Sequence, residues 1–370
     1  MENPFSYTSI VEGDSFCNRQ KEKDDLLSFI INSQNILLYS HRRYGKTSLI
    51  FEVFKKARRK RPKINTIHVD LYGTLSEKEF VAAILSSLSQ IESKVERLVS
   101  LLKNTVRNIK LGWSIDPISG APSGISVSFD SGYNEIMLDN IMGLLNRLSQ
   151  KQKLVVVFDE FQEIANYGQK GFEKRLRKNI QLHQNICYIF CGSQRHILND
   201  IFNNKNRAFY KLAAYYPINK IETGYYFSWA KKLFSKKNIE FEPEIIKDVI
   251  FRCENHPMYV QQFLYFLWDE PEISPETLNK IEHKILQRHY HEFLNLWESL
   301  TANQKKTLKL IVSTDGKEIF YANAIQSVDL KSGSQITRAL HVLIKKDVVC
   351  KNKNYRIQDV MFKKWLQTLL

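Results

Sequence analysis

The sequence lacks any apolar run long enough to cross a membrane. Its longest apolar stretches, such as Leu154–Phe158, have the length of a buried strand, whereas a membrane-spanning helix needs about 20 apolar residues. The opening residues, MENPFSYTSIVEGDSF, carry acids and no apolar run, so they do not resemble a signal peptide. We therefore expect a cytoplasmic protein with no membrane partner.

Cysteines are few, and internal repeats and low-complexity tracts are absent. The five cysteines are scattered without the spacing of a metal site, and two of them fall in one apolar, strand-like segment. Because cytoplasmic thiols stay reduced, we interpret them as core residues rather than as disulfide partners.

Acidic residues are outnumbered by basic ones. The 370 residues include 54 Lys and Arg against 39 Asp and Glu, which gives a net charge of +15. Such an excess favours a polyanionic partner, either nucleic acid or an anionic membrane surface. The alternative, the solvated surface of a lysine-rich protein, stays open on composition alone.

The length of the whole chain suits two or three domains. Strands and helices alternate through its first half. This alternation predicts an α/β fold with a mostly parallel sheet. The expected strands are Asn35–Tyr39, Ile67–Tyr72, Leu154–Phe158 and Ile186–Cys191, and expected helices include Asp24–Ile31, a helix from Lys46 onward, and Ser76–Lys103 with Ser76 and Glu79 as a capping box.

One stretch interrupts the alternation, and two later regions differ in character. Residues 109–129 alternate apolar and polar residues around a turn-rich centre, which predicts an inserted β-hairpin, either a partner-binding arm or an edge decoration. Residues 217–285 are helical, and residues 286–370 have the helix, helix, hairpin order of a winged helix. We therefore expect an α/β core over 1–216, a helical lid over 217–285 and a winged helix over 286–370.

A nucleotide-binding motif follows the first strand. The strand ends at Tyr39, a loop follows, and Gly45-Lys46-Thr47 opens a helix. Backbone N–H groups of such a loop and helix N-terminus point at phosphates, the lysine reaches the β- and γ-phosphates, and the hydroxyl binds Mg²⁺. Ser40 stands where the motif usually has glycine. The expected ATP-contacting residues are Ser40, His41, Arg42, Arg43, Tyr44, Gly45, Lys46, Thr47 and Ser48.

Two acids end the strand Leu154–Phe158. Because ligands of open α/β sheets bind at the carboxyl ends of strands, Asp159 is expected to hold Mg²⁺ together with Thr47. Glu160 is expected to orient and polarise the attacking water. The alternative is an acidic pair that caps the next helix.

Polar residues also end the strand Ile186–Cys191. Ser193 and Gln194 are candidates for a side chain that lies between the carboxylates and the γ-phosphate, and Arg195 is a candidate for neutralising γ-phosphate charge. A strand-end turn without a catalytic role is the alternative.

With these residues in place, the chain resembles the archaeal-type ATPases, which are related to the STAND NTPases and archaeal Orc-type initiators within the AAA+ class. The resemblance covers nearly the whole chain, through FCNRQKEKDDLLSFI before the P-loop, SHRRYGKTSLI, FDEFQEI, ICYIFCGSQR, ENHPMYVQQF and the ending NYRIQDVMFKKWL. It implies an α/β core, a helical lid and a winged helix, with ATP between core and lid.

The resemblance also implies further site residues. Phe16, Arg19 and Glu22 match the family's pattern before the P-loop, and Arg19 is expected to be near the nucleotide. Pro257 matches the proline that touches adenine in STAND relatives, whereas Asn255 replaces the usual glycine of that motif. An arginine finger stays unassigned among Arg175, Arg177 and Arg207, each with a structural role as its alternative.

Three functions agree with these motifs. The first is a switch driven by ATP hydrolysis, acting on a protein partner or through self-association. The second is a DNA-binding ATPase that uses the winged helix, as the resemblance to Orc-type initiators implies, and residues 286–370 hold fourteen Lys and Arg against seven Asp and Glu. Its recognition helix would offer Lys331, Ser334, Gln335, Arg338, Lys345 and Lys346, and Lys55–Lys63 is a second basic stretch. The alternative is a winged helix that packs against its own core and touches no DNA. The third is a nucleotide-stabilised scaffold, which Glu160 argues against.

Overall fold

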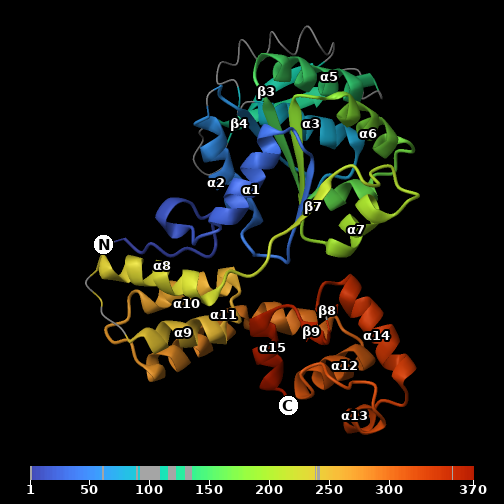
Figure 1. The fold of residues 1–370 in the computed structure, drawn as a ribbon. Coiled ribbons are helices and arrows are strands. Elements are labelled where there is room, and N and C mark those ends of the chain that lie inside the picture. Colours follow the sequence, from blue (N-terminus) through green and yellow to red (C-terminus); the bar gives the residue numbers. More distant parts are fainter. Residues whose placement is uncertain are drawn as a thin grey trace. The chain divides into compact units, whose positions relative to one another are not determined.

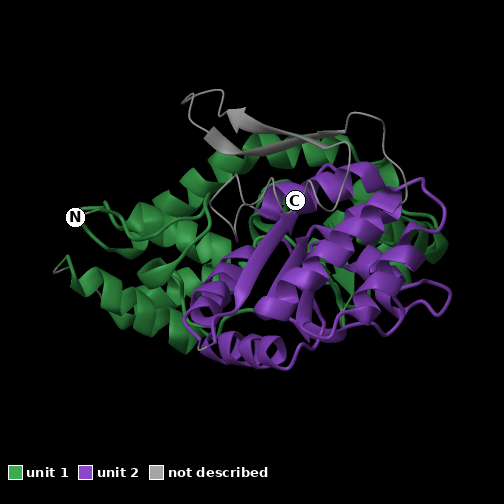
Figure 2. Cartoon of the chain, turned by 90° about the horizontal axis from the view of Figure 1, so that it is seen from above, with its two compact units in different colours: residues 1–18, 43–45, 220–370 green, residues 19–42, 46–219 purple. Residues whose placement is uncertain are grey.

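The computed structural model describes residues 2–60, 62–88, 91, 109–115, 122–129, 136–237, 239, 242–351 and 353–370. The chain divides into two compact units, which are coloured separately in Figure 2. Unit 1 contains residues 1–18, 43–45 and 220–370, and unit 2 contains residues 19–42 and 46–219. Each unit is built around its own apolar core.

Unit 2 is a parallel sheet covered by helices, as the alternating pattern predicts (Figure 1). The strand order is β2-β5-β6-β1-β7, and every neighbouring pair is parallel. The strands are β1 Ile36–Tyr39, β2 Asn65–Asp70, β5 Leu154–Asp159, β6 Ile186–Gly192 and β7 Ala214–Pro217. The helices are α1 Gln20–Ile31, α2 Lys46–Arg58, α3 Glu77–Ser87, α5 Ile136–Lys151, α6 Phe172–Leu182 and α7 Arg195–Asn203, with a 3-10 helix η3 at Phe161–Asn166.

The core of this sheet explains why β5 and β6 are continuous apolar runs. Every residue of β5 and of β6 is buried, as expected for central strands of a parallel sheet with both faces covered. Leu154, Val156 and Phe158 join the core formed with α3, α5, α6 and α7. Because side chains alternate between faces, Val155 and Val157 serve the opposite face. Asp159 is thus the first polar residue after this apolar run, and it lies at the carboxyl end of β5.

The predicted hairpin is present as two antiparallel strands, β3 Ile109–Ile115 and β4 Pro122–Phe129. Their register changes between Ser114 and Ile115. The turn predicted between them lies outside the described residues. Half of the capping box predicted for α3 is present. The Ser76 side chain accepts a hydrogen bond from the Glu79 N–H, but the Glu79 side chain accepts from the Leu75 N–H and not from the Ser76 N–H. The helix ends at Ser87, and residues 92–103 of the predicted helix lie outside the described residues.

Unit 1 combines helices and a winged helix. Its first helices are α8 Thr223–Ser235, α9 Pro243–Arg252, α10 Pro257–Leu267 and α11 Pro275–Glu298, followed by α12 Ala302–Ser313, α13 Ala322–Ser327, α14 Gly333–Lys345, β8 Val349–Lys351, β9 Tyr355–Ile357 and α15 Val360–Gln367. The short strands β8 and β9 pair antiparallel, as predicted for the wing. A capping box of Thr301 and Gln304 starts α12.

The N-terminal segment belongs to unit 1. Phe5 is buried among Trp229, Phe234 and Trp268, with ring centroids 5.2 to 5.8 Å apart. Residues 13–15 form a 3-10 turn, η1 Gly13–Ser15, and the Asp14 carbonyl accepts a hydrogen bond from the Trp229 indole. The first eighteen residues therefore group with the helices, although the predicted division assigns them to the α/β core.

The predicted boundary between lid and winged helix lies within one helix. Residues 285 and 286 are both part of α11, which is continuous from Pro275 to Glu298. Helices α11 and α15 are also in contact, so lid and winged helix share one core. The three-domain division stays a prediction. Among the described residues, no helix combines the length and apolar character needed to span a bilayer.

Candidate active site

The P-loop joins β1 to α2 in the strand, loop, helix order that the motif requires. Gly45 has φ of +81° and Arg43 has φ of +61°, so the loop uses the left-handed region at these two positions. Ser40 has no positive φ, which explains why it can replace the usual glycine. The N–H groups at the start of α2 thus have the setting of an anion site.

Lys46 is the first residue of α2 and is almost fully buried, with 7% of its surface exposed. Its Nζ donates to Ser40 Oγ at 3.4 Å. Burial lowers the pKa of the Lys46 ammonium, and the carboxylates of Glu160 and Asp159 oppose this shift. A buried ammonium with few strong partners gains much from an anionic ligand such as a phosphate.

Asp159 joins three elements of unit 2. Its Oδ2 accepts a hydrogen bond from Thr47 Oγ1 at 3.1 Å and lies 3.1 Å from His68 Nε2, while its Oδ1 accepts the Glu160 N–H at 3.1 Å. Burial alone would raise the pKa of the Asp159 carboxyl, but the bond and charge of His68, together with Lys46, lower it. The carboxylate is therefore held ionised beside the Thr47 hydroxyl.

This pair of oxygen donors fits a magnesium ion. Mg²⁺ prefers hard oxygen ligands and is usually held by one or two protein groups together with phosphates and water. Thr47 Oγ1 and Asp159 Oδ2 already lie within hydrogen-bond distance of each other, so one cation can reach both. Outside this pair, the described residues contain no group of three or more His, Cys, Asp or Glu side chains that could hold a metal.

Glu160 follows β5 in the left-handed conformation, with φ of 50° and ψ of 42°. Its Oε2 accepts hydrogen bonds from Ser193 Oγ at 3.2 Å and from the side-chain amide of Gln162. Glu160, the predicted base, and Ser193, the predicted residue at the end of the neighbouring strand β6, are thus in direct contact. Gln194 is the N-cap residue of α7, and its backbone carbonyl accepts from the helix.

Arg195 and Arg19 have intramolecular partners in the described structure. The Arg195 guanidinium lies over the Tyr39 ring at 5.4 Å, at the end of β1. Arg19 is buried, forms a 2.9 Å ion pair with Glu22 and donates to the Asn219 carbonyl at 2.9 Å. These bonds give Arg19 a structural role that ties the start of α1 to the chain beyond β7, and its contact with nucleotide stays a prediction.

The three arginine-finger candidates are paired within unit 2. Arg175 pairs with the buried Glu77, and Arg177 donates to the carbonyls of Ala208 and Tyr210. Arg207 pairs with both Glu173 and Asp200. These pairings favour the structural alternative for all three arginines.

The proline motif lies in unit 1 together with part of the P-loop. Pro257 is the first residue of α10, a position that suits proline because no helical N–H is needed there. Asn255 has φ of 59°, so it adopts the backbone conformation for which glycine is favoured in this motif. Within the same unit, the ring of Tyr44 meets that of His256 edge to face at 5.0 Å, and Arg43 lies 3.3 Å from the Met258 sulfur.

Two site residues were not predicted from the sequence, His68 and Gln162. His68 points from β2 to the Asp159 carboxylate, and a histidine inside an alternating strand gives no signal of such a role. Gln162 lies two residues after Glu160 within FDEFQEI and donates to the Glu160 carboxylate. Its closeness in sequence to the acidic pair is the one feature that could have indicated this contact.

The fold and the site together define a class. A parallel sheet whose first strand leads into a lysine-threonine helix start, with an Asp-Glu pair at the end of a neighbouring strand, is the fold of a P-loop ATPase. In this chain it is joined to a winged helix.

Solved structures with a similar fold include a Walker-type ATPase and two ORC proteins. The Walker-type ATPase PABY2304 of Pyrococcus abyssi is 16% identical with a TM-score of 0.72, and the match covers 98% of this chain and 99% of that one. The ORC2 protein of Aeropyrum pernix, in ADPNP-ADP complexes, is 14% identical with a TM-score of 0.61, covering 99% and 98%. The ORC1 protein of Aeropyrum pernix, in complex with DNA, is 12% identical with a TM-score of 0.50, covering 96% and 94%.

A family model described as a probable winged helix domain matches residues 291–368. The comparison with curated proteins gave no match. The resemblance to archaeal-type and Orc-type ATPases that the motifs indicate is thus confirmed for the fold, including the C-terminal winged helix.

Proposed function

We propose that this chain binds ATP with Mg²⁺, hydrolyses it, and uses the nucleotide state to control its winged helix. The observation that carries the proposal is the meeting of Thr47 and Asp159 at 3.1 Å beside the buried Lys46. Thr47 and Asp159 would hold the cation, which neutralises phosphate charge when bound. Lys46 binds the β- and γ-phosphates, which give its buried ammonium a strong anionic partner.

Hydrolysis needs a base, and Glu160 is the residue proposed for it. Its carboxylate lies at the end of β5 and would accept a proton from the attacking water. A scaffold that only binds nucleotide has no need of such a group, so the contact of Glu160 with Ser193 favours catalysis. Ser193 acts by fixing the carboxylate, and Arg195 is available to approach phosphate charge only by leaving the Tyr39 ring.

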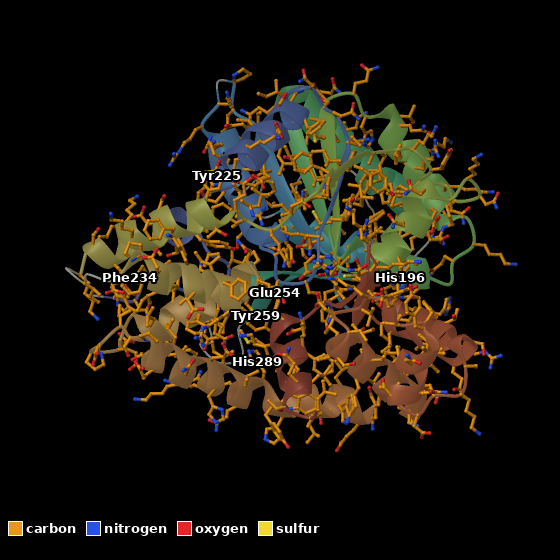
Figure 3. The ribbon with its side chains drawn as sticks, turned by 60° about the horizontal axis from the view of Figure 1, so that its bottom comes forward. His196, Tyr225, Phe234, Glu254, Tyr259 and His289 are labelled. Atoms are coloured by element: carbon orange, nitrogen blue, oxygen red, sulfur yellow. The ribbon has the colours of Figure 1, made fainter. Side chains whose placement is uncertain are left out.

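Contacts within unit 1 support a role in switching. The His256 ring, which meets Tyr44, also lies 4.9 Å from the Tyr259 ring. Tyr259 is buried, and its hydroxyl donates to both carboxylate oxygens of Asp359 at 2.7 Å. Tyr259 also meets the ring of His289, and both are labelled in Figure 3. A P-loop residue is thus linked by side-chain contacts to the winged helix.

The far end of this series is a helix cap. Asp359 Oδ1 accepts the N–H groups of Met361 and Phe362, which start α15. We infer that phosphate binding, by changing the conformation of Tyr44, alters the support of the Asp359 cap. The contact of Pro257 with adenine is part of the same proposal, since Pro257 follows His256 directly.

A DNA-binding ATPase is the second candidate, favoured by the exposed face of α14. Ser334, Thr337, Arg338, His341 and Lys345 are exposed at helical spacing, and Lys346 follows them. Arg338, Lys345 and Lys346 have no ion-pair partner within the part of the chain that the structure describes. Cations in this state are available to phosphates of a duplex.

Two predicted DNA-contacting residues are engaged elsewhere. Gln335 Oε1 accepts the Lys331 N–H at 2.8 Å, and Ser334 Oγ lies 2.8 Å from Ser332 Oγ. The basic residues therefore carry this candidate function, and sequence readout by Gln335 is not part of it. The A. pernix ORC1 structure contains DNA, which supports testing a duplex here.

The experiment is a phosphate-release assay with ATP, with and without Mg²⁺. We expect wild type to hydrolyse ATP only with Mg²⁺. Lys46→Ala should lose at least about tenfold in ATP affinity, because hydrogen bonds to charged groups contribute about 1.5–3 kcal/mol. Lys55→Ala removes a lysine of the same helix that pairs with Glu52 and serves as the control. Hydrolysis by wild type no faster than by Lys46→Ala would contradict the proposal.

A further inference from the structure

Gln162 is a buried side chain whose one polar contact among the described residues is to the proposed base. Only 2% of its surface is exposed. Its Nε2 donates to Glu160 Oε2, the same oxygen that accepts from Ser193 Oγ at 3.2 Å. Gln162 comes from η3 and Ser193 follows β6, so two separate elements hold one carboxylate oxygen.

The other end of the amide lies against Gly192. A Cβ at Gly192 would lie 2.1 Å from Gln162 Oε1, so the amide can occupy this position only because residue 192 is glycine. Gln162 Oε1 is buried and has no hydrogen-bond partner among the described residues. Buried polar atoms are almost always paired. Reversing the amide would place Oε1 against the Glu160 carboxylate, which is worse, so the carboxylate sets the orientation.

The second oxygen of Glu160 remains available. Two donors hold Glu160 Oε2. Within the described residues, Glu160 Oε1 has no hydrogen-bond partner, and it is not among the buried polar atoms that lack one. A general base works only when its accepting atom is held within reach of the proton. An arrangement that fixes one oxygen and leaves the other open meets this requirement.

We propose that Gln162, seated on Gly192, is a positioning residue that works with Ser193 to hold Oε2 so that Oε1 faces the attacking water. The inference rests on the proposed ATP hydrolysis. In that reaction the water oxygen bonds to the γ-phosphorus, and the bond to the β–γ bridging oxygen breaks with its electron pair leaving on ADP. The proton of the water passes to Oε1. Gln162 touches neither water nor phosphate and acts only through Glu160.

The test separates catalysis from binding. Gln162→Ala should lower kcat about 10- to 100-fold, because misplacing a catalytic group by about 1 Å costs up to about that factor. Its affinity for ATP with Mg²⁺, measured by calorimetry, should stay within about twofold of wild type. Gly192→Ala should give the same split, because the added methyl displaces the amide. Gln181→Ala removes an exposed glutamine of α6 and should match wild type.

A double-mutant cycle decides whether Gln162 acts through Glu160. In the Glu160→Gln background, Gln162→Ala should have no further effect on kcat. A full loss repeated in that background would overturn the inference, as would wild-type kcat in Gln162→Ala. If Gln162→Ala does not fold, Gln162→Asn, which keeps the amide but shortens its reach, takes its place with the same outcomes. Absence of hydrolysis in wild type overturns the proposed function and this inference with it.

Discussion

Polar residues at the strand ends of unit 2 differ from those on α14 in how they are held. Lys46, Asp159 and Ser193 are at most 8% exposed, and their side chains form hydrogen bonds with Ser40, Thr47 and Glu160, respectively. The cations Arg338 and Lys345 on α14 are exposed. A buried polar group depends on each partner, whereas exposed charges act as a sum. Single substitutions should therefore have large effects in the first region, and only combined substitutions in the second.

The largest effect is expected at the buried site. Glu160→Gln keeps the shape of the side chain but cannot accept a proton, so kcat should fall by at least about 10²-fold. Binding of ATP with Mg²⁺ should persist, since Lys46, Thr47 and Asp159 are unchanged. Single-turnover hydrolysis and calorimetry measure the two quantities. A rate equal to wild type would exclude Glu160 as the base. It would also contradict the expectation that single substitutions in the buried site have larger effects than those on α14.

The next effect concerns the buried contact that links α10 to the winged helix. Tyr259→Phe removes the hydroxyl that donates to Asp359, so the free energy of unfolding should drop by about 1.5–3 kcal/mol, the usual contribution of a hydrogen bond to a charged group. Chemical denaturation measures this loss. Tyr265→Phe, on the same helix, is the control because its hydroxyl makes no hydrogen bond among the described residues. Equal stability of the two variants would contradict the linkage.

A smaller, additive effect is expected on α14. Replacing Arg338, Lys345 and Lys346 with alanine should weaken duplex binding by at least about tenfold at low salt. It should also reduce the slope of log affinity against log salt by about 2.7, since each phosphate contact contributes about 0.9.

The control for α14 removes the same charge from other helices of unit 1. Lys231, Lys247 and Lys280 are exposed on α8, α9 and α11, and their alanine variant should keep the wild-type slope. If both triple variants have the same slope of log affinity against log salt, DNA binding depends on the net charge of the protein and not on α14. No duplex binding by wild type at low salt would end the DNA-binding candidate.

The last effect tests a partly buried group of unit 2 that lies outside the site. Burial lowers the pKa of His183 to about 4, and its Nδ1 lies 2.6 Å from the Tyr188 hydroxyl. The unfolded chain therefore takes up this proton first as the pH falls. The folded state loses stability from about pH 6.5 down to about pH 4. His183→Gln should flatten this part of the stability curve, and the exposed His283→Gln should not. An unchanged curve for His183→Gln would contradict the pKa assignment.

The sequence predicted the strands and the P-loop well because those features are local. The apolar runs before Tyr39, Asp159 and Ser193 predict buried strands, and all three are found in the parallel sheet. Parallel strands align their carboxyl ends, so residues that follow them meet. This explains why Ser193 and Glu160 were both predicted and are in contact.

Other residues depend on tertiary interactions that no local pattern encodes. His68 meets Asp159 because β2 pairs with β5, a register fixed only in the folded sheet. Arg19 was expected near nucleotide from a family pattern, whereas its ion pair with Glu22 and its bond to residue 219 are set by the tertiary structure. The grouping of residues 2–18 with unit 1 likewise follows from the burial of Phe5.

The central claim is that nucleotide state controls the winged helix, and hydrogen exchange tests it most directly. The amides of Met361 and Phe362, which Asp359 caps, should exchange more slowly in Glu160→Gln with ATP and Mg²⁺ than with ADP and Mg²⁺. Amides of β6 serve as the internal reference. Equal exchange of the two capped amides in both nucleotides, with each nucleotide bound, would contradict the switch.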